Sequence, residues 1–144
     1  MPALRQGVEV VGLGDFRKQL KELGDKAWLK ELGGINNEVA QLIVDGAKTR
    51  ALSLGSTPAH AVQTGGLKAS KAASAAMVIL GGSGVPFAIG AEFGSDKWHQ
   101  FKPWTGAGAD AGHFLYPEIR AERDRIGELY LDRMVGFAAK AFPN

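Results

Sequence analysis

The residues best suited to chemistry lie in one glycine-rich stretch of the second half of the chain: His99, His113, Asp96 and Asp110. Imidazole nitrogens and carboxylate oxygens are common ligands of zinc and other transition metals. A metal-dependent or hydrolytic small enzyme built on the His99 and His113 loop is therefore one hypothesis. However, no histidine of the chain stands in the His-Glu-x-x-His spacing that places two imidazoles on one helix face. The pattern therefore favours polar loop residues that bind no metal.

The other candidates for catalysis or cofactor binding each lack a required partner. Residues 81–84 (Gly-Gly-Ser-Gly) have neither the Lys-Ser/Thr of a phosphate-binding loop nor the Gly-x-Ser-x-Gly of a nucleophile elbow. Glu92 is an acid in the apolar run 85–93, where an exposed strand end or an arginine partner is a commoner role than catalysis. The chain has no cysteine, which excludes a thiol nucleophile. We therefore expect a protein that is not an enzyme and binds no cofactor.

The charge balance is close to neutral, with 17 basic and 15 acidic residues and a formal net charge of +2. The slight basic excess allows a DNA-binding packaging accessory as a second alternative. The charges of opposite sign interleave along the helical segments, so sequence-specific DNA binding is not indicated. No apolar run approaches the ~20 residues that span a bilayer, and the N-terminus has no apolar signal region. We expect no membrane partner and synthesis in a cytoplasm.

A long loop is expected over residues 95–113, where no hydrophobic period is visible and large aromatic side chains stand among glycines. Two interpretations stay open for Trp98, Phe101 and Trp104. They can anchor an interface with another protein, or fold back as a lid on the protein's own core. The residues that we consider candidates for an interface are Trp98, Phe101, Trp104, Glu92, Phe93 and His113.

Hydrophobic spacing predicts helices in the N-terminal half. Residues 1–12 are expected as an arm or a short strand, with a β-branched run at its end. Apolar residues at helical spacing predict a short helix over 14–24 and a longer one that ends near Leu52. The pair Gly33 and Gly34 interrupts this longer segment, because each glycine costs about 1 kcal/mol relative to alanine in a helix. One helix with a weak point and two separate helices are both compatible with the pattern.

Strands are expected in the middle of the chain. Residues 59–66 are interpreted as an irregular connector, and 67–80 as strands because apolar residues alternate near their end. Residues 81–84 would then form a hairpin turn, and 85–89 the returning strand.

A long helix is predicted from Tyr116 and Pro117 onward, since proline favours the first turn, and residues 138–144 are expected as a tail. The fold class that we predict is α+β. It has N-terminal helices, a small antiparallel sheet of three or four strands in the middle, and a long C-terminal helix packed on the sheet. The whole chain, 1–144, is expected to form a single domain.

Three segments resemble, in the same order, a family of minor tail or tail-completion proteins of long-tailed double-stranded DNA phages. The first is Thr-Pro at residues 57–58, followed by Thr-Gly-Gly-Leu at 64–67. The second, residues 85–94 (Val-Pro-Phe-Ala-Ile-Gly-Ala-Glu-Phe-Gly), is similar to the family's Val-Pro-Tyr-Ala and Glu-Phe-Gly segment. The third, residues 114–120 (Phe-Leu-Tyr-Pro-Glu-Ile-Arg), resembles the opening of the family's last helix. The likeness extends from about Gly12 to Met134.

The resemblance implies a structural protein of the virion, at the joint between head and tail, assembled in the host cytoplasm. It implies a self-associating ring, commonly a hexamer, that completes the tail or joins it to the head. Its expected neighbours are other connector proteins and the tail tube or tail terminator, and DNA would pass through the channel without sequence-specific binding. A closed ring needs two different contact surfaces on each subunit. The loop 95–113 is our candidate for one of them.

Overall fold

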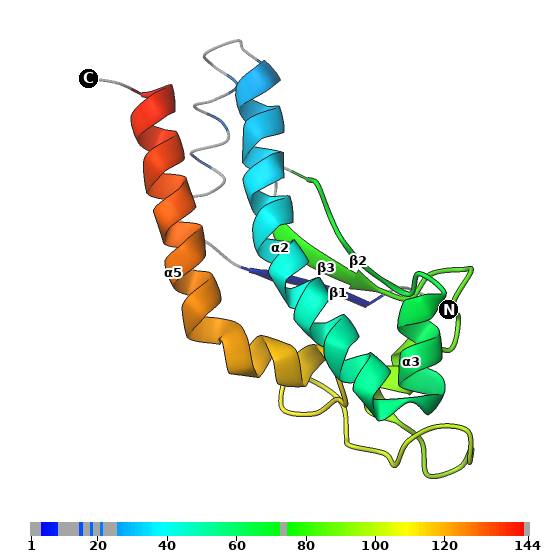
Figure 1. The fold of residues 1–144 in the computed structure, drawn as a ribbon. Helices are drawn as coiled ribbons and strands as arrows, with labels where there is room; N and C mark the ends of the chain where they lie inside the picture. Colours follow the sequence, from blue (N-terminus) through cyan, green and yellow to red (C-terminus); the bar gives the residue numbers. More distant parts are fainter. Residues whose placement is uncertain are drawn as a thin grey trace.

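We analysed a computed structural model of the chain, which describes residues 4–8, 15, 18, 21, 26–72 and 75–142. Figure 1 shows two long helices side by side, with a small sheet against one of them and shorter helices at the lower end. The elements in chain order are β1 (Leu4–Val8), α2 (Lys26–Leu54), α3 (Ser56–Gln63), β2 (Leu67–Ala69), β3 (Ala76–Leu80), α4 (Ala88–Phe93) and α5 (Leu115–Ala141).

The sheet has three antiparallel strands in the order β1-β3-β2. The central strand β3 alternates between buried and partly buried residues, as expected when only one face of a sheet packs against helices. Ala76, Val78 and Leu80 form the buried face. Leu80 pairs with Leu4 on one side and with Leu67 on the other, so the core-facing side chains of the three strands are in register.

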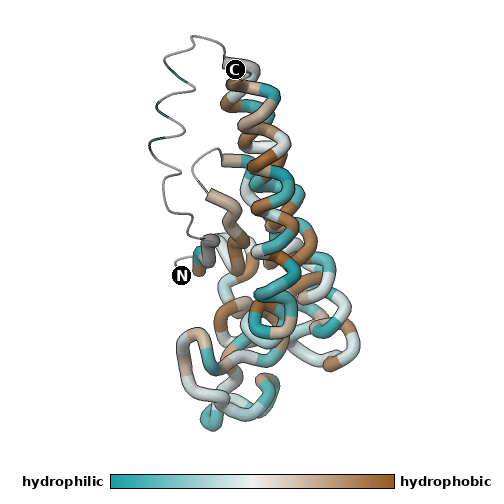
Figure 2. Tube along the Cα trace, turned by 90° about the vertical axis from the view of Figure 1, so that its left-hand side faces the viewer, coloured by the Kyte–Doolittle hydropathy of each residue, from teal (hydrophilic) through white to brown (hydrophobic). Residues whose placement is uncertain are grey.

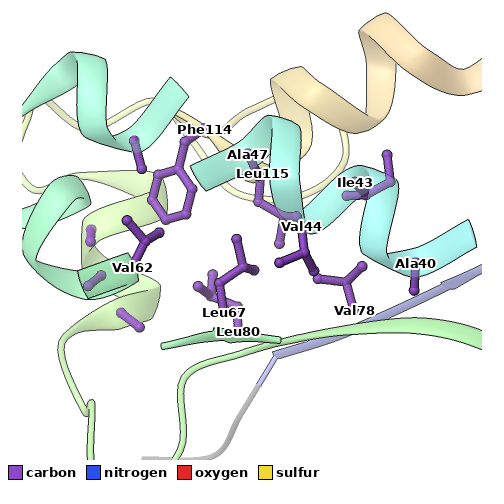
Figure 3. Close-up of a cluster of buried hydrophobic side chains, with 14 of the residues drawn as sticks. Ala40, Ile43, Val44, Ala47, Val62, Leu67, Val78, Leu80, Phe114 and Leu115 are labelled. Atoms are coloured by element: carbon purple, nitrogen blue, oxygen red, sulfur yellow. The ribbon is translucent and has the colours of Figure 1, made fainter. Parts of the chain in front are cut away.

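Helix α2 supplies the largest part of the core. Its residues Val39, Ile43 and Val44 are buried at helical spacing and lie over the sheet, where the close-up in Figure 3 shows Val44 and Val78 together. The helix continues through Gly33 and Gly34 without a break. The helix propensity of two glycines is therefore outweighed by the tertiary contacts of their neighbours, which bury Leu32 and Asn36 completely.

Helix α5 runs antiparallel to α2 and contributes Ile126 and Tyr130 to the same core. Tyr130 donates a hydrogen bond from its hydroxyl to the Asn36 side-chain oxygen, and Asn36 in turn donates to the Ala72 carbonyl at 2.9 Å. These bonds connect α5, α2 and the segment between β2 and β3. The predicted α+β fold, with a long C-terminal helix packing on the sheet, is confirmed.

The interpretation of residues 59–66 as an irregular connector is wrong for most of that segment, because α3 occupies Ser56–Gln63. The sequence Gly-Ser-Thr-Pro at 55–58 does end α2, but it also begins the next helix. Proline is tolerated in a first helical turn, where its missing N–H has no partner to lose. Pro58, Ala61 and Val62 are buried, which stabilises this short helix against the core.

The predicted returning strand at 85–89 is also wrong, and residues 81–84 do not form a hairpin turn. Both sides of β3 are already paired, with β1 and β2, so a further strand has no free edge beside it. The amide of Gly81 donates to the Gly66 carbonyl at 2.7 Å, which continues the pairing toward β2. Residues after Pro86 turn into helix α4 instead, with Ala91 N bonded to Phe87 O at 2.9 Å.

The predictions for the two ends of the chain have mixed outcomes. Strand β1 lies within the segment 1–12 that we expected as an arm or short strand. The helix predicted over 14–24 lies outside the residues that the structure describes, apart from three isolated positions. At the other end α5 continues to Ala141, so residues 138–141 are helical and not part of a tail.

Candidate functional site

Glu92 lies at the centre of the region where α4, the loop 95–113 and α5 meet. It is fully buried, and its carboxylate accepts three backbone hydrogen bonds. His113 N and Phe114 N donate to Oε1 at 2.6 and 2.8 Å, and Tyr116 N donates to Oε2 at 2.8 Å. These are amides at the start of α5, which have no partner inside the helix and favour a negative charge. Glu92 therefore caps α5 from another element.

This position corrects the expectation that Glu92 is an exposed strand end or pairs with an arginine. A second bond joins the same two segments, because His113 N also donates to the Glu92 carbonyl at 2.7 Å. The negative charge of Glu92 also affects the neighbouring Tyr116 hydroxyl. Burial of Tyr116, and then the negative charge of Glu92, raise the pKa of the tyrosine hydroxyl above its ordinary value. The carboxylate is thus engaged in holding the helix start, away from solvent.

The loop 95–113 has no helix or strand but is fastened to itself and to α4 by hydrogen bonds. Ser95 N donates to Lys102 O at 2.8 Å, and Thr105 N donates to Phe93 O at 2.9 Å. The Thr105 hydroxyl accepts a bond from Gly112 N at 2.9 Å. These bonds hold the two arms of the loop together, so its outer residues are presented from a defined backbone.

Gly94 makes the first turn of the loop possible. Its φ of +80° lies in the left-handed region, which glycine adopts without steric cost. A Cβ at this position would lie 2.1 Å from the Pro103 carbonyl oxygen. Both the conformation and the close approach of the returning arm therefore require a residue without a side chain.

Two of the four side chains considered for a metal site hold the loop. The His113 ring nitrogen Nε2 bonds with the Pro103 carbonyl at 2.8 Å, and Asp96 Oδ1 accepts a bond from Trp104 N at 3.3 Å. His99 and Asp110 are exposed. In the part of the chain that the structure describes, no three His, Asp or Glu residues lie close enough together to hold a metal ion. The geometry gives the metal-dependent alternative no supporting cluster.

The aromatic residues divide between the two roles that the sequence left open. Phe101 folds back on α4, where a Cβ on Gly90 would lie 3.0 Å from its ring. Phe93 is buried and packs against Tyr116 with ring centroids 5.8 Å apart. Trp98 and Trp104, by contrast, expose 54% and 50% of their surface. Of the six interface candidates, these two tryptophans have the most exposed large apolar side chains, whereas Phe101 is only partly exposed.

A cavity of about 380 Å³ lies between α2, β3 and α5 and was not foreseen from the sequence. It is lined mainly by apolar side chains, among them Val39, Val78 and Ile126, and its polar contributors are Tyr116 and Arg123. Among the residues that the structure describes, the lining contains no histidine and no acid, and Tyr116 supplies its one hydroxyl.

Sequence reasoning also missed two exposed apolar residues of α5. Leu131 and Val135 expose 66% and 61% of their surface. The period of the helix places Ile126, Tyr130 and Phe137 on the buried face. Leu131 and Val135 are apolar but fall outside that face, and this mismatch is the sequence signal that could have identified them. Figure 2 views the molecule from the α5 side, with hydrophobic residues recurring along the outer helix.

No protein-family model matches the chain, and searches of curated proteins and of solved structures find no similar protein. None of the helices in the described ranges has the length and apolar character needed to cross a membrane.

Proposed function

We propose that the chain is a non-enzymatic structural subunit of the head–tail connector of a long-tailed phage, where copies form a ring around a DNA channel. The observation that carries the proposal is the pair Trp98 and Trp104, half exposed on a loop that hydrogen bonds hold in place. Tryptophan is enriched at the centres of protein interfaces, and a preorganised loop loses little conformational freedom on binding.

Two of the three segments that carry the family resemblance also support this loop. Residues 85–94 contain Glu92, and residues 114–120 contain the helix start that Glu92 caps. Gly94, the last residue of the first of these segments, forms the turn into the loop. The residues that resemble the family therefore hold the base of the loop in place. This role supports a subunit whose loop takes part in assembly.

The charges are consistent with a subunit that lets DNA pass without binding a sequence. Several of the basic residues are engaged with acids of the same chain: Arg50 with Glu118, and Arg133 with Glu38. Guanidinium groups held in this way are less available to phosphates than a free basic cluster.

The test is the position of the chain in particles made from the genome that encodes it. We expect the chain in purified particles, labelled at the junction of head and tail, in the copy number of a ring. Interruption of its gene should leave DNA-filled heads and separate tails. Particles that join normally without the chain, or a location in the capsid shell or at the tail tip, would contradict the proposal.

A further inference from the structure

The outward face of α5 carries a stripe that the fold leaves uncovered. Asp124, Glu128, Leu131 and Val135 follow one another at i, i+4, i+7 and i+11, which places them on one face of the helix. All four are exposed, and their face of the helix lies opposite the face that buries Ile126, Tyr130 and Phe137. We call these four residues, with exposed Ala139 one turn further on, the α5 stripe.

The two halves of the α5 stripe differ in chemistry. Its first half is acidic, and neither Asp124 nor Glu128 forms an ion pair with another described residue. Its second half is apolar, with Leu131 and Val135 more than half exposed. An apolar patch with a charged rim is the usual composition of a protein contact surface.

The loop 95–113 has the complementary chemistry. Trp98 and Trp104 are apolar, and the ammonium of Lys97 lies over the Trp98 ring, 5.2 Å from its centroid. Lys97 is exposed and pairs with no acid in the described part of the chain. A cation beside tryptophans on one surface thus matches carboxylates beside aliphatic residues on the other.

The loop and the apolar half of the α5 stripe lie toward opposite ends of the molecule. Figure 1 shows the loop at the lower end, whereas the C-terminal half of α5 extends to the upper end. The loop is therefore remote from the apolar half of the stripe of its own chain, although its residue Ala109 lines the same cavity as Arg123 and Gly127, next to the acidic half. Two different complementary surfaces on one subunit join copies head to tail, and such contacts close into a ring when the rotation between copies allows it.

We propose that the Trp98 and Trp104 loop of one copy docks on the α5 stripe of the next copy, with Lys97 beside Glu128. The occupant of the stripe is thus a second copy of this chain. The inference rests on the proposed function, for which it names the contact between neighbouring subunits.

The decisive experiment mixes two variants that each lack one surface. The loop variant carries Trp98→Ala and Trp104→Ala, and the stripe variant carries Leu131→Asp and Val135→Asp. Because all four side chains are at least half exposed, we expect each variant to stay folded, although the loop variant also loses the contact of the Trp104 ring with Phe93, 6.5 Å between centroids. Each alone should be monomeric under conditions where the wild type associates. An equimolar mixture should form heterodimers, which keep one intact contact, and nothing larger.

Disulfide trapping covers the case in which association is weak. The chain has no cysteine, so Lys97→Cys in one copy and Glu128→Cys in another provide two thiols at positions that the proposal places side by side. Mild oxidation of the mixture should give a cross-linked dimer well above the yield with Lys68→Cys, an exposed position on β2, in place of Glu128→Cys. Equal yields would overturn the proposal. So would a stripe variant that associates like the wild type, or a mixture of variants that stays monomeric while the wild type associates.

The two proposals fail in different ways. If the chain lies in the connector and the stripe variant is incorporated normally, the docking contact is wrong and the proposed function stands. If the cross-link forms but the chain is absent from particles, the docking contact stands and the proposed function is wrong.

Discussion

The two ends of α5 are held to their neighbours by different physical interactions. At the lower end, the α4–α5 junction, the buried carboxylate of Glu92 binds the first amides of α5. At the upper end, which we call the distal end, Leu32 and Phe137 form a small apolar cluster against Trp28. The ion pair between Lys140 and Glu31 at the distal end is exposed, and such pairs contribute little.

Because of this difference, one end of α5 determines where the loop lies and the other end only holds the helices together. Hydrogen bonds to a buried charge are directional and costly to leave unmade, so the junction holds the loop's backbone in one arrangement. Apolar contacts are non-directional and allow small shifts of one helix along the other. The junction therefore stabilises the fold and also positions the loop, whereas the distal end stabilises the fold without positioning the loop.

The largest effect is expected from Glu92→Leu, which removes the carboxylate acceptor of the buried amides of Phe114 and Tyr116, whereas His113 N keeps its bond to the main-chain carbonyl of residue 92. We expect the free energy of unfolding to fall by about 4 kcal/mol, since each orphaned buried group costs about 1–3 kcal/mol. Glu92→Gln keeps one acceptor oxygen and should lose about half as much. Urea unfolding measures both. Equal losses for the two variants would show that the bonds to the carboxylate are not the cause.

Phe137→Ala tests the distal end. Removing this ring from its contact with Trp28, whose centroid is 5.8 Å away, should cost about 3 kcal/mol, and Phe137→Leu should cost less than half of that. Because the junction is remote, the amide resonances of the loop should stay unchanged. Loop resonances that broaden or shift in Phe137→Ala would contradict the separation of the two ends.

Gly94→Ala measures how tightly the loop is closed. Gly94 and Gly106 both have positive φ, but a Cβ on Gly106 meets no atom within 4 Å, whereas one on Gly94 meets the Pro103 carbonyl. Gly106→Ala should therefore cost only the left-handed conformation, about 1–2 kcal/mol. We expect Gly94→Ala to cost about 2 kcal/mol more, because the returning arm must move. A difference near zero in thermal unfolding would mean that the arm is free to shift.

The elements with a strong period were predictable from the sequence, and those that depend on distant partners were not. The α2 pattern and the opening of α5 at Pro117 are local signals, and both helices are present. Helix α4 was mistaken for a strand because residues 85–89 are β-prone, while the lack of a free edge beside β3 is visible only in three dimensions. Local propensity was overridden by tertiary structure there.

The candidate site was predictable in composition but not in the role of each residue. The loop follows from a glycine-rich aromatic segment without a period, but the sequence does not show which of its aromatic side chains are exposed. The role of Glu92 does not, because its partners are backbone amides more than twenty positions away, and an amide carries no sequence signal. The exposed residue Leu131 was overlooked because the buried face of α5 accounts for the helical spacing without it.

The smallest effect concerns Tyr130, which lies on α5 between the junction and the distal end. Burial raises the pKa of its hydroxyl above the ordinary value of about 10, and the hydroxyl donates to Asn36. At neutral pH, Tyr130→Phe should cost about 1 kcal/mol, because the Asn36 oxygen loses its donor.

The pH dependence of this cost follows from the direction of the shift. Since the folded pKa is raised, the contribution of Tyr130 is complete below the unfolded pKa and is lost as pH rises through the folded one. The wild type should therefore lose its advantage over Tyr130→Phe above about pH 10. Urea unfolding of both proteins from neutral to alkaline pH measures the difference. A constant difference would mean that the hydroxyl is not titrated in the unfolding transition, and that the bond to Asn36 contributes only through geometry.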